Sequence, residues 1–117
     1  MSAFVIARET EQEAQDAICY AWELAAIDKP ELEHLFANVD PKAVMFHTFK
    51  KYPHIGTNGG TAAGLVGDYD QVAERIREFS ELGIELFMLQ FQPFEAEMRR
   101  FAHEVLPRVR RLSAVPA

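Results

Sequence analysis

Two glutamines at the end of an apolar run are the strongest candidates in this sequence for side chains that contact a ligand. Gln90 and Gln92 stand in LQFQP, at the end of the apolar run IELFMLQF. Functional groups in α/β folds gather at the carboxyl ends of strands, and an amide can hydrogen-bond a neutral ligand without adding charge. A polar side chain in an apolar strand also needs a structural partner, so the two interpretations of this pair are equally supported.

A glycine-rich stretch, GTNGGTAAGLVG at 56–67, lies directly ahead of a helical pattern. It lacks the lysine of a P-loop and the G-x-G of a dinucleotide fingerprint, so a phosphate cradle is disfavoured. A plain connector and a ligand-gating loop remain open, because hydroxyl and amide groups lie there on a backbone that glycine keeps adaptable. The candidate residues of such a loop are Thr57, Asn58, Gly59, Gly60 and Thr61.

No metal site is expected from the four histidines, which neither pair at helical spacing nor adjoin an acidic cluster. The sequence HEVLP resembles H-E-x-x-H, but Pro107 replaces the second histidine. His47 and His54 lie in a long loop, where proton transfer is conceivable and simple solvent exposure is favoured. Cys19, the single cysteine, is interpreted as a packing residue on a helix.

The amino-acid composition limits the classes of protein to which this chain can belong. The chain has 117 residues, 49% hydrophobic and 26% charged, as expected of one globular domain. The net charge of −6 argues against nucleic-acid or anionic-membrane binding and favours a small molecule or a protein as partner. One cysteine, no leader and no membrane-length apolar run predict a cytoplasmic location.

Strands and helices alternate along the chain, around one long loop. Thr10 with Glu13 and Asp68 with Gln71 have the spacing of reciprocal helix caps. The predicted elements are a strand at 2–7, a helix at 10–28, a loop at 29–63, a strand at 64–67, a helix at 69–82, a strand at 84–91 and a helix at 94–111. Apolar strands that alternate with amphipathic helices predict an α/β fold with a parallel sheet. Three such units would cover one face of the sheet and leave the other exposed.

Three segments resemble one known family: FVIARETEQEA, GTNGGTAAGLVGDYDQVAERIREFSELGIELFMLQF and FEAEMRRFAHEVLP. They look like the C-terminal third of the bacterial-luciferase-like, reduced-flavin-dependent monooxygenases. Within that family they are most similar to the dimethyl sulfone branch, with alkanesulfonate monooxygenases as relatives. The resemblance covers nearly the whole chain.

The resemblance implies a partial (β/α)8 TIM barrel, in which this chain supplies the last three βα units with a long loop insertion. It implies a monooxygenase that oxidises a small organosulfur compound with C–S cleavage. Reduced FMN would come from a separate NAD(P)H-dependent reductase, and no FMN is expected on this segment alone. The glycine-rich loop would exclude water as a lid. Apolar strand residues would face the barrel interior, namely Val5, Leu65, Leu86 and Met88.

The sequence also departs from the alkanesulfonate pattern. Phe4 stands where that branch has a histidine, Ser2 where it has an arginine and Gln92 where it has a tyrosine. The stretch 52–67 contains no arginine. A sulfonate needs such cations and a sulfone does not, so a neutral substrate is favoured. The catalytic residues stay unassigned. Two alternatives remain: a non-catalytic segment that forms homo-oligomers, and another flavin or deazaflavin oxidoreductase of the same superfamily.

Overall fold

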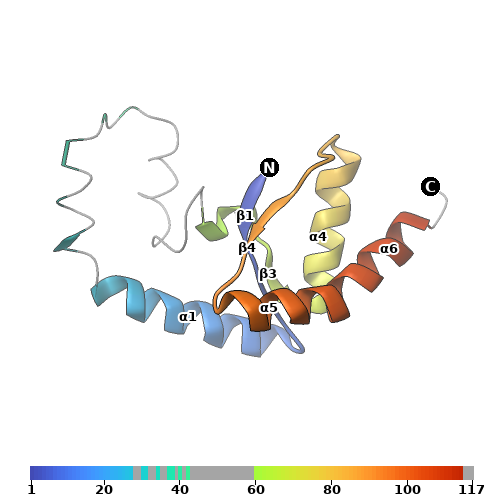
Figure 1. Ribbon diagram of the computed structural model, residues 1–117, viewed down its shortest axis with the longest axis horizontal. Helices are drawn as coiled ribbons and strands as arrows, with labels where there is room; N and C mark the ends of the chain where they lie inside the picture. Colours follow the sequence, from blue (N-terminus) through green and yellow to red (C-terminus); the bar gives the residue numbers. More distant parts are fainter. Residues whose placement is uncertain are drawn as a thin grey trace.

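The computed structural model describes residues 1–27 and 60–114, with residues 30, 31, 34, 37, 38, 40 and 42 between them (Figure 1). The elements in chain order are β1 (Ser2–Phe4), β2 (Ile6–Arg8), α1 (Glu11–Ile27), the 3-10 helix η1 (Gly60–Ala63), β3 (Val66–Asp68), α4 (Tyr69–Glu81), β4 (Met88–Gln90), α5 (Phe94–Arg100), the π-helix η2 (Phe101–Val105) and α6 (Leu106–Ala114). Most of the loop predicted at 29–63 lies outside the described residues.

The N-terminal segment lies between the other two strands. β1 pairs with β4 and β2 pairs with β3, and both pairs are parallel. The Val5 N–H donates to the Gln90 carbonyl at 3.0 Å, and the Ile6 N–H donates to the Leu65 carbonyl at 2.9 Å. Successive N–H groups of a strand point to opposite edges, so these two partners flank the segment. The α/β fold with parallel strands is confirmed, and its sheets are open.

Both faces of the N-terminal segment are covered, contrary to the expectation of one bare face, although Leu86 and Met88 at β4 remain exposed. Ala3, Val5 and Ala7 face a cluster that includes residues of α4 and η2. Phe4 and Ile6 face α1 on the opposite side. Because the first strand is central, the crossover to β3 and the return to β4 run in opposite directions. Right-handed crossovers then place α1 and α4 on opposite faces.

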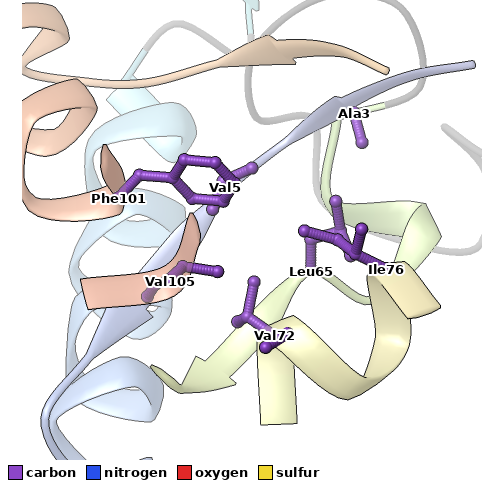
Figure 2. Close-up of a cluster of buried hydrophobic side chains, with 9 residues drawn as sticks. Ala3, Val5, Leu65, Val72, Ile76, Phe101 and Val105 are labelled. Carbon is purple, nitrogen blue, oxygen red and sulfur yellow. The ribbon is translucent and has the colours of Figure 1, made fainter. Parts of the chain in front are cut away.

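The larger core cluster lies between the strands and the second half of the chain. Figure 2 shows Val5, Leu65, Val72, Phe101 and Val105 converging from two strand segments, α4 and η2. Leu65, Val72 and Val105 are the largest fully buried side chains. Burial of these three apolar side chains stabilises the packing of α4 and η2 against the strands.

The strands are shorter than the sequence patterns predict, for geometric reasons. The run 2–7 becomes β1 and β2, which meet at Val5 and pair with different partners. The strand expected at 64–67 is Val66–Asp68, since Gly64, with φ of +75°, donates its N–H to Thr61 and closes η1. The strand expected at 84–91 is Met88–Gln90, because Ser2 already lies opposite Met88 and residues 84–87 extend past β1.

The expected helices are present with small shifts in their ends. The reciprocal caps expected at Thr10 and Asp68 are both formed. α4 ends before Gly83, whose φ of +99° suits a residue that follows a helix. The last helix is interrupted by η2, where the Leu106 N–H donates to the Phe101 carbonyl five residues back. A π turn therefore lies just before Pro107, a residue that has no N–H to donate.

Helices long and apolar enough to cross a membrane do not occur within the described ranges.

Candidate functional site

The candidate site lies at the carboxyl ends of β2 and β3. The chain leaves β2 for α1 on one face and leaves β3 for α4 on the other face. Ligands of open α/β sheets bind in the crevice that such diverging connections create. A cavity of about 310 Å³ lies here, lined by Glu9, Asp68, Tyr69, Asp70, Glu104 and Arg108. Arg8 and Asp68 are opposite each other in the register of β2 and β3.

Asp68 is held in place by the start of α4. Its Oδ1 accepts a hydrogen bond from the Gln71 N–H at 2.8 Å, and the Gln71 side chain accepts from the Asp68 N–H at 2.9 Å. Gly67 lies next to this cap. A Cβ at position 67 would lie only 2.5 Å from Gln71 Oε1. The glycine before the helix thus makes room for the cap.

Arg108 reaches from α6 across the cavity wall. Its Nε lies 2.9 Å from Asp70 Oδ1 and its Nη1 lies 3.2 Å from Glu104 Oε2. Its guanidinium carbon lies 5.2 Å from the centre of the Tyr69 ring. Desolvation lowers the pKa of Arg108, but hydrogen bonds to Glu104 and Asp70 outweigh this effect and the pKa is raised. Arg108 is therefore a permanent cation whose charge two carboxylates already compensate.

A second network links β2 to α5 beside the cavity. Arg8 Nη1 donates to Glu97 Oε2 at 2.5 Å and to the Ala7 carbonyl at 3.0 Å. Glu97 is the one buried charged residue within the described ranges, 8% exposed. Arg100 Nε lies 3.4 Å from the same carboxylate oxygen, and Arg100 Nη1 donates to the Tyr69 hydroxyl at 3.3 Å. That hydrogen bond to Tyr69 is the main reason why the pKa of Arg100 is raised.

Sequence reasoning missed this network. Arg8 is the sole basic residue among the first 28 and directly follows the strand core, which is a signal that could have singled it out. Glu97 offers no comparable signal, because an acidic residue early in a helix is ordinary. Its burial becomes visible only when α5 lies against β2.

The structure brings two of the predicted site residues together. Phe4 and Gln90 are register partners in β1 and β4. Phe4 is 6% exposed and packs under α1, and Gln90 is half-buried. Gln92 is exposed beyond the end of β4. None of these three residues lines the cavity at β2 and β3.

The predicted loop residues are only partly described. Gly60 and Thr61 begin η1, and the Thr61 carbonyl accepts the Gly64 N–H at 3.0 Å. Thr57, Asn58 and Gly59 lie outside the described residues. Across the parts of the chain that the structure describes, no group of histidine, cysteine and acidic side chains could hold a metal ion.

Comparison with known proteins places the chain among relatives of flavin-dependent monooxygenases. No protein-family model matches it. The FMNH(2)-dependent dimethylsulfone monooxygenase of Pseudomonas fluorescens (strain Pf0-1) is 31% identical over 127 residues, which cover 97% of this chain and 33% of that enzyme. The enzyme of the same name from Pseudomonas putida is 31% identical over 125 residues, 96% of this chain and 32% of its own length.

The predicted resemblance is thus confirmed as homology, and it extends through nearly all of this chain. The chain spans about a third of the length of these curated relatives. What their names state, the use of FMNH2 and of dimethylsulfone, is a property of those enzymes.

The described strand ends do not fit the phosphate of FMN. A phosphate dianion requires uncompensated cations or free backbone N–H groups. Arg8, Arg100 and Arg108 each lie within 3.4 Å of a carboxylate, and the cavity lining adds two further acidic side chains, Glu9 and Asp68. A flavin phosphate therefore requires residues beyond those described here.

Proposed function

We propose that this chain forms the C-terminal part of a reduced-FMN-dependent monooxygenase that oxidises a small organosulfur compound, such as dimethyl sulfone, with C–S cleavage. The observation that carries the proposal is the 31% identity through 97% of the chain. In this proposal the chain contributes the last three βα units of a (β/α)8 barrel. It acts only together with the remaining two thirds, which would bind the flavin phosphate.

The charge pattern at the strand ends supports a neutral substrate. A sulfonate needs a cation that is not already compensated, but Arg8 is paired with Glu97 and Arg108 with Asp70 and Glu104. A sulfone needs only hydrogen-bond donors, and the amide of Gln92 is exposed after β4. We therefore assign to Gln92, which follows β4 and lies outside the cavity at β2 and β3, a contact with the substrate in the whole enzyme.

The proposed reaction requires a supply of reduced flavin. An NAD(P)H-dependent flavin reductase would provide it, which suits a cytoplasmic enzyme. When bound, reduced FMN would activate oxygen for insertion into the substrate. The part of this chain at the strand ends would shape the substrate pocket and keep it free of excess charge.

The test is a chimera in which this chain replaces the matching third of the Pseudomonas fluorescens relative. With NADH and a flavin reductase, the chimera should consume dimethyl sulfone, and the 117-residue chain alone should not. The parent enzyme is the positive control. A chimera that folds and binds reduced FMN but leaves dimethyl sulfone untouched would contradict the assigned substrate. It would favour the alternative of another flavin- or deazaflavin-dependent oxidoreductase of the same superfamily.

A second candidate is a non-catalytic segment that forms homo-oligomers. The exposed side chains of Leu86 and Met88, 75% and 61% accessible, favour it, because apolar strand residues are costly in water. Sedimentation of the chain alone distinguishes the two candidates. A stable oligomer together with an inactive chimera would support this second function.

A further inference from the structure

The strand segments do not lie side by side in the order in which they follow one another along the chain. β1 and β2 form one N-terminal segment, which pairs with β3 along one edge and with β4 along the other. The Val5 N–H donates to the Gln90 carbonyl, and the N–H of the next residue, Ile6, donates to the Leu65 carbonyl. Successive N–H groups point to opposite edges, so the first strand segment is central and the last one lies directly beside it.

A closed barrel of successive βα units requires a different strand order. In a (β/α)8 barrel each strand lies between the strand that precedes it and the strand that follows it. The last strand, β4, would then pair with β3, and a strand from the preceding part of the polypeptide would pair with β1. In this chain β4 itself occupies that edge of β1.

The helices depart from the barrel arrangement in the same way. Phe4 and Ile6 pack under α1, whereas Val5, on the opposite face, packs in the cluster that contains Val72 and Ile76 of α4. α1 and α4 therefore cover opposite faces of the N-terminal segment, although a barrel places all its helices on the outside. The face that a barrel would turn to its interior is covered by α4 in this chain.

The segment around β4 is the least buried of the strand segments. Residues 3–7 are all buried, whereas none of the residues 82–96 is. Leu86 and Met88 remain exposed at 75% and 61%. Separation of β4 from β1 therefore uncovers little apolar surface, and the larger cost of a new strand order is the movement of α4, whose Val72 is fully buried.

We propose that this chain has two arrangements and that the pairing of β4 with β1 is an autoinhibitory contact in the first of them. Alone, the chain uses β4 to occupy the edge of β1 on which assembly with the remaining two thirds of the enzyme depends. In the assembled enzyme, β4 leaves β1 for the other edge of β3, and α4 moves to the face that α1 covers. Conversion requires the larger core cluster to open cooperatively, because Val72 must leave it.

The inference rests on the proposed function, but its test reports strand order and not activity. Ser2 and Met88 are register partners in β1 and β4, and Ser2→Cys with Met88→Cys is made in a Cys19→Ser background. A disulfide spans Cα atoms roughly 4.4–6.8 Å apart, whereas strands separated by a third strand lie about 10 Å apart. The pair should form an intramolecular disulfide in the isolated chain. The yield should be at least tenfold lower in the chimera with the Pseudomonas fluorescens relative.

A second cysteine pair is the matched control. Ile6 and Val66 are register partners in β2 and β3, which are neighbours in both arrangements. Ile6→Cys with Val66→Cys, in the same background, should form its disulfide equally in the isolated chain and in the chimera. Thiol titration and mass spectrometry at several protein concentrations measure both yields and separate intramolecular links from links between copies. If the chimera fails to fold, both pairs are placed at the matching positions of the Pseudomonas fluorescens enzyme, where the same difference is expected.

A disulfide between positions 2 and 88 that forms as fully in the folded chimera as in the isolated chain would overturn the inference, because β4 would then have stayed beside β1. So would its absence from an isolated chain in which the control disulfide forms. A chimera with the low yield and no sulfone oxidation would keep the inference and refute the proposed function. An active chimera with the full yield would do the reverse.

Discussion

Arg8 Nη1 lies 2.5 Å from Glu97 Oε2, although the two residues are 89 positions apart in the chain. The contact joins the carboxyl end of β2 to α5. The side chains are 19% and 9% exposed, so water screens the pair only weakly. Through Arg100 the same carboxylate is connected to Tyr69 at the start of α4. One buried carboxylate thus ties together three elements around the candidate site.

Replacing Glu97 with glutamine should lower the free energy of unfolding by about 3 kcal/mol, since it leaves the half-buried Arg8 charge without its main partner. Glu95→Gln is the matched control, because Glu95 pairs with Arg99 at the surface of the same helix. That change should cost no more than about 0.5 kcal/mol. Urea denaturation measures both values. Equal losses for the two variants would show that burial of Glu97 adds nothing to its pairing.

Gly67→Ala should weaken the cap of α4. The new Cβ would lie 2.5 Å from Gln71 Oε1, so the Gln71 side chain must move and lose its bond to the Asp68 N–H. We expect a loss of about 1 kcal/mol, the typical contribution of one such hydrogen bond. In a Gln71→Ala background the same glycine substitution should cost less. A double-mutant cycle by thermal melting tests this, and strict additivity would mean that Gly67 acts independently of the cap.

The carboxyl of Glu74 should titrate below its ordinary value of 4.5. The hydrogen bond from Arg77 lowers its pKa, desolvation opposes the shift, and the charge of Arg77 adds to the lowering. A carboxylate whose pKa is lowered by folding stabilises the protein above pH 4.5, and this contribution disappears as the pH falls through the folded-state pKa. An NMR titration of Glu74 should show its pKa rise toward 4.5 in Arg77→Gln. Arg75→Gln, a control on the same helix, should leave that pKa unchanged.

Gln92→Ala in the chimera should lower kcat/KM for dimethyl sulfone several-fold and leave the affinity for reduced FMN unchanged. Loss of one hydrogen bond to a neutral oxygen, about 0.5–1.5 kcal/mol, accounts for a change of this size. Gln92 is exposed, so stability should not change. Gln15→Ala, an exposed glutamine on α1, is the control. Unaltered sulfone kinetics in the Gln92 variant would remove this residue from the substrate side.

Local features of the fold could be predicted from the sequence, because the interacting groups lie a few residues apart. The Asp68–Gln71 cap, the end of α4 at Gly83 and the alternation of strands and helices are of this kind. Three sequence segments also predicted the resemblance to flavin-dependent monooxygenases, and homology confirms it. The roles of Phe4, Gln90 and Gln92 remain predictions.

The tertiary structure decided the order of the strands and the pairing of distant charges. Apolar periodicity shows that a strand is buried but does not say which strand lies at each edge, so the central position of residues 2–8 was not predictable. Four residues expected to face one interior differ for this reason: Val5 and Leu65 are buried, while Leu86, which precedes β4, and Met88, in β4, are exposed. Arg8 and Glu97 meet only because α5 packs on β2, a contact that depends on the whole chain between them.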